Sequence, residues 1–259
     1  MGFIFPIILL VVLIYFFGNY FKMLGWNKPK KKLNPESKKL LYKHVDFYRK
    51  LSFVDQQHFQ YKVQEFLLNT EIIGVETEVE LLDKLLIASS AVIPIFKFKT
   101  WRYDLDEVIL YPRAFNQKFQ TNADTEGRQI LGMVGYGFME GKMMLSKEAL
   151  RLGFSNQTDK KNTAIHEFVH LIDKEDGDID GIPSVLLENQ YTLPWMRMVM
   201  KKIIQLRRKK HKDIDIYGAT NQAEFFAVIS TYFFEQPRLL KRKHPELYKL
   251  LCEIFEHKV

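Results

Sequence analysis

The hydrophobic and polar positions divide the chain into an apolar N-terminal segment and a longer part with regular periodicity. Residues 3–21 are apolar or aromatic except for Pro6, Gly18 and Asn19. As a helix this segment would be about 28 Å long, close to the roughly 30 Å hydrocarbon thickness of a bilayer. No charge precedes it and no small-residue cleavage site follows it, which favours an uncleaved anchor over a cleaved signal peptide. We therefore expect a transmembrane anchor at residues 1–21.

Lysines follow the apolar segment closely, namely Lys22, Lys28, Lys30, Lys31 and Lys32. Because positively charged flanks stay on the cytoplasmic side of a membrane, they predict the orientation of the chain. We expect residues 22–35 to form a basic linker. The expected location is the cytoplasmic (inner) membrane, crossed once, with the folded part facing the cytoplasm. The single cysteine, Cys252, excludes an intrachain disulfide and agrees with that reducing compartment.

The periodicity after residue 35 predicts several helices and a few central strands. Helical spacing of apolar residues covers residues 36–51, 54–69, 79–93, 159–174, 193–210, 221–235 and 245–257. Asp55 is placed to cap the second of these helices, and Pro94 to end the third. Strand patterns cover residues 96–101, 107–111, 129–139 and 142–145, with Gly141 in the turn between the last two. This order predicts an α+β fold, mostly helical with a small sheet, over residues 36–259.

Composition and charge narrow the function classes. The 47% of hydrophobic residues and 27% of charged residues are typical of a globular protein and not of a disordered one. The net charge of +7 comes in part from a second basic run at residues 201–212. No nucleic-acid-binding motif accompanies this run, so a solvated helix face is favoured over contact with nucleic acid or anionic lipid.

The pattern with the most specific chemistry is His-Glu-x-x-His at residues 166–170. Positions i and i+4 of a helix share a face, so His166 and His170 can reach one metal ion, and zinc suits nitrogen ligands. Glu167 lies one residue along and can polarise a water molecule instead of binding the metal. Apolar neighbours indicate a buried helix, which Asn162 or Thr163 can cap.

A catalytic zinc needs a third protein ligand. Glu224 is an acid surrounded by apolar residues on the helix expected at residues 221–235, and a lone carboxylate there should be paired or metal-bound. Asp173, one turn beyond His170, is the competing ligand or a group that orients a histidine. Tyr217 could stabilise a developing oxyanion, or it is an ordinary packed tyrosine. Glu235, at the end of the same helix as Glu224, is expected to be solvated.

These motifs, in this order, resemble a known family. The segments that carry the resemblance are HEFVHLID, Asp176-Gly177, DGIP at residues 180–183, YGATNQAEFFAV at residues 217–228, YFFEQP and PELY. Over roughly residues 36–257 the chain is similar to the Mlc titration factor A (MtfA) family of zinc-dependent peptidases. That family is in turn similar to the catalytic domain of anthrax lethal factor.

The resemblance implies a zincin-like fold with zinc held by His166, His170 and Glu224. It also implies Glu167 as the general base, Tyr217 as a group that stabilises the transition state, and hydrolysis of short peptides. In one branch the family binds a glucose-responsive transcriptional regulator, a partner that belongs to a particular regulatory circuit and is not carried over to this chain.

Two features depart from the family: the apolar N-terminal segment, and Lys147 where an aromatic residue is expected, which could alter the substrate cleft. The expected function is zinc-dependent hydrolysis of peptide or protein substrates. The alternative is a non-catalytic, zinc-containing protein that binds a regulator at the membrane. The intact Glu167 argues against it, because a structural zinc site needs no base.

Overall fold

The computed structural model describes residues 25–116, 121, 129–135, 137–156, 159–208 and 213–255. The expected anchor and the first residues of the expected linker lie outside this described part. Within it, none of the helices combines the length and the apolar character needed to cross a bilayer.

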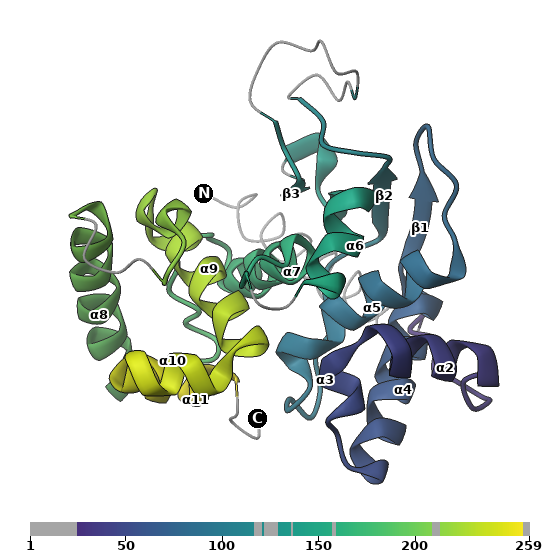
Figure 1. The fold of residues 1–259 in the computed structure, drawn as a ribbon, viewed down its shortest axis with the longest axis horizontal. Helices are drawn as coiled ribbons and strands as arrows, with labels where there is room; N and C mark the ends of the chain where they lie inside the picture. The colour runs from purple at the N-terminus through teal and green to yellow at the C-terminus, as the bar shows by residue number, and fades with distance from the viewer. Residues whose placement is uncertain are drawn as a thin grey trace, which may run out of the picture.

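Helices make up most of the described chain (Figure 1). The α-helices are α2 (Pro35–His44), α3 (Asp46–Arg49), α4 (Phe53–Asn69), α5 (Leu81–Ile95), α6 (Lys147–Ser155), α7 (Thr163–Asp173), α8 (Asn189–Arg207), α9 (Gln222–Glu235), α10 (Pro237–Lys243) and α11 (Pro245–Phe255). Three short 3-10 helices are η1 (Gly137–Met139), η2 (Lys174–Asp176) and η3 (Ile216–Ala219). The strands are β1 (Glu71–Gly74), β2 (Glu107–Tyr111), β3 (Gly132–Val134) and β4 (Lys142–Ser146).

The four strands form one mixed sheet in the order β1-β2-β4-β3. The first three strands of this order are parallel, and β3 pairs antiparallel with β4, with Gly132 opposite Leu145. Side chains alternate between the two faces of a sheet. Val108 and Leu145 accordingly belong to the main core, while Ile109 and Met144 belong to a smaller apolar cluster on the other face. The helices and the small sheet confirm the predicted α+β fold class.

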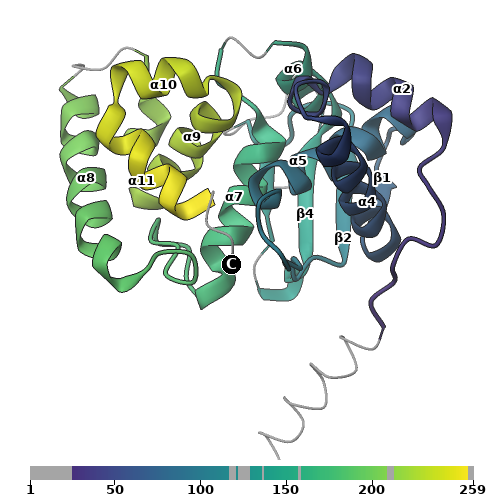
Figure 2. The same ribbon diagram turned by 90° about the horizontal axis from the view of Figure 1, so that it is seen from below.

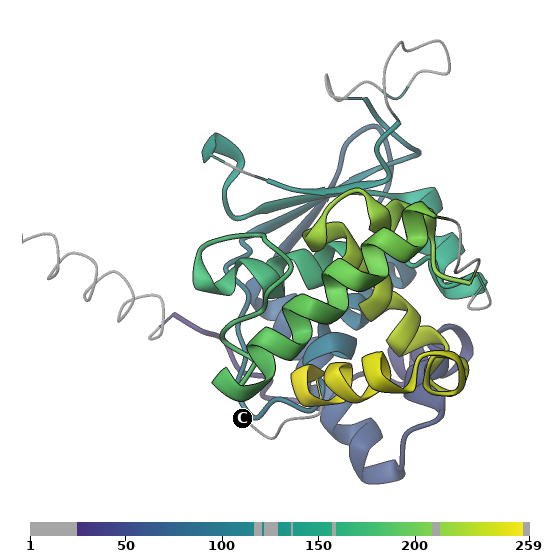
Figure 3. The same cartoon turned by 90° about the vertical axis from the view of Figure 1, so that its left-hand side faces the viewer.

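Helix α7 lies at the centre of the molecule, with the sheet and α2–α5 on one side and α8–α11 on the other (Figures 1 and 2). Seen from the α8 side, the strands form a layer with helices packed beneath it (Figure 3). The ring of Phe168 on α7 lies 5.6 Å from that of Phe66 and 5.2 Å from that of Tyr103. On the other side, Phe226 on α9 lies 5.6 Å from Trp195. Both sides therefore share one core with α7.

Several sequence predictions of secondary structure are wrong in detail. Residues 96–101 are not a strand, because α5 continues to Ile95 and the N–H of Phe98 donates to the Ile95 carbonyl at 3.0 Å. Pro94 lies inside the last turn of α5, so it does not end the helix before itself. Ser52, and not Asp55, caps α4, since its hydroxyl accepts from the Asp55 N–H at 3.2 Å.

Other segments were divided or missed. The helix expected at residues 36–51 breaks at Val45, which is extended and separates α2 from α3. In its described residues, the strand expected at residues 129–139 contains the bridge at Ile130, β3 and η1 in place of one continuous strand. Elements β1, α6 and α10 were not predicted. By contrast, β2 and β4 are confirmed, and Gly141 before β4 has φ +72°, which explains the glycine.

The described part of the segment expected as a linker packs against α4. The indole Nε1 of Trp26 donates to Glu65 Oε1 at 3.1 Å, and the guanidinium of Arg102 lies 4.9 Å from a Trp26 ring centroid. The backbone N–H of Asn27 donates to Asn69 Oδ1, and the Asn69 amide donates to the Asn27 carbonyl, both at 2.8 Å. These contacts fasten the start of the described chain to the folded domain.

Candidate metal centre

Helix α7 carries the His-Glu-x-x-His motif in a buried setting. The side chain of Asn162, rather than Thr163, caps the helix and accepts from the Ile165 N–H at 3.1 Å. Phe168 and Val169 are fully buried on the faces that pack into the core. The cap and this packing fix the rotation of α7, so the polar motif faces the space between α7 and α9.

Three side chains from α7 and α9 converge at one point. His166 Nε2 lies 3.0 Å from Glu224 Oε2, and His170 Nε2 lies 3.1 Å from His166 Nε2. His170 Nε2 is also 3.6 Å from Glu224 Oε2. One ligand atom from each residue lies within 4.8 Å of the others. Asn221 caps α9 and accepts from the Glu224 N–H at 2.8 Å, which holds this carboxylate in the first turn.

The donor set fits a divalent metal ion. Both histidines direct Nε2 toward the same carboxylate, and a neutral imidazole nitrogen without a proton is only an acceptor. In the tautomer that leaves Nε2 of both histidines unprotonated, three acceptor atoms converge, and a cation between them satisfies all three. Two imidazole nitrogens and one carboxylate oxygen, with room for a water molecule, are the ligands typical of catalytic zinc sites.

The pKa values of Glu224 and His170 depend on contacts between the residues of the centre. Burial alone would raise the pKa of Glu224, but hydrogen bonds to His166 and His170 outweigh it and hold that pKa well below its ordinary value. Burial would lower the pKa of His170, but the hydrogen bond to Glu224 and nearby carboxylates raise it. The arrangement therefore favours an ionised Glu224, the form that binds a metal.

Glu167 lies beside this centre, enclosed between α7 and β3. The residue is 6% exposed, and burial raises the pKa of its carboxyl group while His166 and His170 act in the opposite sense. A Cβ atom on Gly132 would lie 2.8 Å from Glu167 Cγ and 3.0 Å from Glu167 Oε1. Only glycine lets β3 approach the carboxylate this closely. Sequence reasoning missed Gly132, although glycine inside a strand is a known sign of close approach.

Tyr217 reaches the centre from η3. Its hydroxyl donates to Glu224 Oε1 at 3.1 Å, and its ring centroid lies 6.1 Å from that of His166. The side chain of Asp215 accepts from the Tyr217 N–H at 3.0 Å and fixes the short helix. The residue is 37% exposed, so it lies at the accessible side of the centre.

Asp173 is not among the converging ligand atoms. It is fully buried, and its Oδ2 accepts from the Gly181 N–H at 2.8 Å, while burial raises its pKa to about 7. Gly181 has φ +80°, and a Cβ there would lie 2.4 Å from the Gln222 carbonyl carbon. Asp173 therefore holds the loop after α7 against the start of α9, two residues before Glu224.

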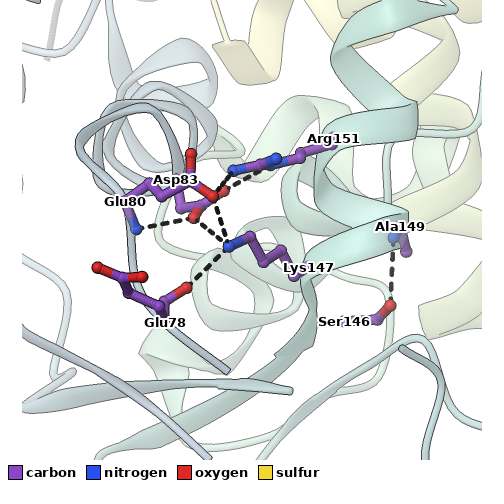
Figure 4. Close-up of polar contacts among 7 residues, drawn as sticks. All are labelled: Glu78, Glu80, Asp83, Ser146, Lys147, Ala149 and Arg151. Carbon is purple, nitrogen blue, oxygen red and sulfur yellow. Dashed lines mark hydrogen bonds and ion pairs between the residues drawn. The ribbon is translucent and has the colours of Figure 1, made fainter. Parts of the chain in front are cut away.

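Lys147, the departure from the family pattern, is bound to the start of α5 (Figure 4). Its ammonium donates to the Glu78 carbonyl at 2.8 Å and to Glu80 Oε1 at 2.9 Å, and pairs with Asp83 Oδ2 at 3.1 Å. Arg151 also contacts Asp83, through Nε at 2.8 Å. These contacts tie α6 to α5, and the effect of Lys147 on a substrate cleft stays a prediction.

Comparison with known proteins identifies the family. The family described as glucose-regulated metallo-peptidase M90 matches residues 24–256, which is most of the chain. The chain belongs to this M90 metallopeptidase family. Its relatives include the Mlc titration factor A proteins, so the resemblance drawn from the sequence motifs is confirmed. The similarity to anthrax lethal factor stays a prediction.

Relatives of this M90 chain differ in how much they share with it. The uncharacterized protein slr2042 of Synechocystis sp. is 30% identical over 261 residues, covering 96% of this chain and 94% of the relative. Mlc titration factor A of Escherichia fergusonii is 28% identical over 162 residues, 60% of each chain. The protein of that name from Escherichia coli O17:K52:H18 is 27% identical over 163 residues. The match spans about 60% of the length of these two relatives.

Proposed function

We propose that this M90 family member is a zinc-dependent peptidase, with zinc held by His166, His170 and Glu224. The observation that carries the proposal is the convergence of these three ligands with Glu167 enclosed beside them. A zinc ion there would supply a Lewis acid that acidifies water and polarises a carbonyl group.

In this proposal the chain's own residues move the proton. Glu167 takes the proton from the attacking water and later passes it to the leaving amine. The Tyr217 hydroxyl, which here donates to Glu224 Oε1, turns to donate to the oxyanion that develops on the substrate carbonyl. Asp173 acts through the loop that fixes the start of α9 and does not touch the reacting atoms.

The position of β3 supports a peptide as the substrate. It is the last strand of the sheet, and the Gly135 N–H and the Leu131 carbonyl pair with β4. Backbone groups alternate in direction along a strand, so those of Gly132 and Val134 point to the outer edge. That edge faces Glu167, whose carboxylate accepts a backbone hydrogen bond from Val134. An extended peptide pairing with this edge would place its carbonyl groups near the proposed base.

The test compares the full-length chain with Glu167→Gln and Glu224→Ala. Zinc content and hydrolysis of chromogenic peptides are measured on the same preparations. We expect about one zinc per chain in the wild type and in Glu167→Gln, activity only in the wild type, and loss of metal in Glu224→Ala. A Glu167→Gln protein that still cleaves peptides would refute the assignment of the base. Zinc without hydrolysis of any peptide would favour the alternative, a regulator-binding protein.

We also propose that the N-terminal apolar segment anchors the enzyme in the cytoplasmic membrane, with the catalytic domain on the cytoplasmic side. The apolar length of residues 3–21 and the lysines that follow support this location. The prediction is that the full-length protein sediments with membranes and resists extraction by high salt, while removal of residues 1–21 releases it. Release of the full-length protein by salt alone would contradict the anchor.

A further inference from the structure

A cavity that none of the proposed metal ligands lines lies between the two halves of the molecule. Its volume is about 290 Å³, and it is lined by the end of α5, by α3 and α6, by the start of α7 and by α9–α11. Figures 1 and 2 show these two groups of helices on opposite sides of α7. At about 30 Å³ per water molecule, the cavity has space for a ligand of roughly ten to fifteen non-hydrogen atoms.

Aromatic rings form much of the wall of this cavity. The aromatic lining residues are Phe47, Phe96, Phe154, Phe233, Phe234, Tyr248 and Phe255. They pack against one another, with Phe234 and Phe255 centroids 4.9 Å apart and Phe233 and Tyr248 centroids 5.4 Å apart. The faces of aromatic rings attract organic cations. One ring already does so, because the ammonium of Lys97 lies 5.6 Å from the Phe96 centroid.

A carboxyl group lies in the same wall. Glu235, the last residue of α9, lines the cavity, and neither of its carboxyl oxygens has a hydrogen-bond partner of ordinary geometry among the described residues. Both oxygens are buried, contrary to the solvated position expected from sequence. Burial and then the charge of Asp159 raise the pKa of Glu235 to about 8, although a hydrogen-bonding contact with the Asn162 side chain, outside ordinary geometry, partly offsets this. An incoming donor would supply the partner that these oxygens lack.

Other charged residues at the cavity already have partners. Lys50 forms an ion pair with Asp46, and Lys97 lies over Phe96. Among the titratable residues that line the cavity in the described part of the chain, Glu235 is therefore the one whose side-chain oxygens lack a partner of ordinary geometry.

We propose that this cavity binds an apolar organic cation, a primary ammonium group carried on a hydrophobic body, with Glu235 as the acceptor of its N–H groups. The aromatic rings hold the body and add cation–π attraction, and rotation of the Glu235 side chain brings its oxygens to the ammonium. The cavity touches Asn162, the cap of α7, and the last turn of α9, so its ligand contacts both helices of the metal centre. The site does not depend on the proposed peptidase activity.

The experiment is a calorimetric titration of the full-length chain after removal of metal with a chelator, so that an amine cannot bind zinc instead. The ligands share one skeleton: 4-phenylbutylamine, 4-phenylbutan-1-ol and 4-phenylbutyrate. We expect the amine to bind roughly tenfold or more tightly than the alcohol, because a hydrogen bond to a charged group contributes about that factor. The carboxylate should bind more weakly than both.

Variants locate the site. Glu235→Gln should reduce the affinity for the amine to that for the alcohol and leave the affinity for the alcohol unchanged. The control is Glu246→Gln, at an exposed carboxyl group on α11, which should change neither affinity. Phe234→Leu should weaken binding of the amine while Glu235 stays in place. This variant tests the site if Glu235→Gln does not fold. Equal binding of amine and alcohol, tighter binding of the carboxylate, no binding of any ligand, or an amine affinity that Glu235→Gln leaves intact would each overturn the proposal.

Discussion

Replacing Gly132 by alanine tests whether the close approach of β3 positions Glu167. The new Cβ would lie 2.8 Å from Glu167 Cγ and 2.8 Å from Thr163 Cγ2. Carbon atoms at their best separation are about 3.5–4.0 Å apart, so each contact is short by about 0.7 Å or more. The flexible glutamate side chain must yield, because Gly132 is held in the sheet opposite Leu145.

Two effects of different size should follow. Overpacking costs about 1–3 kcal/mol, which lowers Tm by roughly 2–12 °C for a domain of this size. A base displaced by several tenths of an ångström should lower kcat by about tenfold or more, since a 1 Å displacement can cost about a hundredfold. The metal ligands are not among the clashing atoms, so zinc content should stay unchanged.

The assay measures kcat, KM, zinc content and Tm on one preparation of each variant. Leu131→Ala is the matched control, because Leu131 precedes Gly132 in the chain and is 49% exposed. It should retain wild-type kcat. A Gly132→Ala enzyme with wild-type kcat, zinc bound and the strand intact would refute the claim that β3 places the carboxylate.

Three further predictions concern single side chains. Tyr217→Phe should lower kcat by about a hundredfold with zinc retained, measured by peptide hydrolysis and metal analysis; an unchanged kcat would leave Tyr217 outside the mechanism. Asp83→Asn should destabilise the fold by about 3 kcal/mol in urea unfolding, because Lys147 and Arg151 lose a fully buried partner. A loss of unfolding free energy no larger than that caused by replacing an exposed acid would show that these ion pairs of Asp83 do not stabilise the fold. The raised pKa of Glu235 means that the folded state holds a proton that the unfolded state releases, so stability falls as pH rises from about 4.5 to about 8. Glu235→Gln should remove that part of the pH dependence. If the wild type gives the same unfolding curve at every pH across this range, the prediction is refuted.

The sequence was most informative where the relevant contacts are local or chemically unusual. The His-Glu-x-x-His spacing needs only a helix to bring His166 and His170 to one face. Glu224 is 58 residues away from His166, yet a single acid among apolar neighbours indicated its helix. Asn221, which caps this helix, and the capping residues of other helices can also be recognised from the local sequence.

What could not be predicted depends on how distant segments meet. Gly132 matters only because β3 lies against α7, and Lys147 finds its partners 64 to 69 residues earlier in the chain. Strand β1 is four residues long and too short to show a period. The alternation of Phe96 and Phe98 resembled a strand because both rings are buried, although their backbone forms turns.

The docking of Trp26 and Asn27 on α4 affects where the chain can be cut. A truncation designed from the hydrophobic pattern would begin near residue 34 and would discard these two residues together with Leu33, which is 7% exposed. Glu65 would lose its hydrogen bond to Trp26 and Asn69 its hydrogen bonds to Asn27, and the apolar surface under Leu33 would face water. A recombinant fragment beginning at residue 25 keeps these contacts. It is therefore the better choice for expression and crystallisation of the enzyme without its apolar segment.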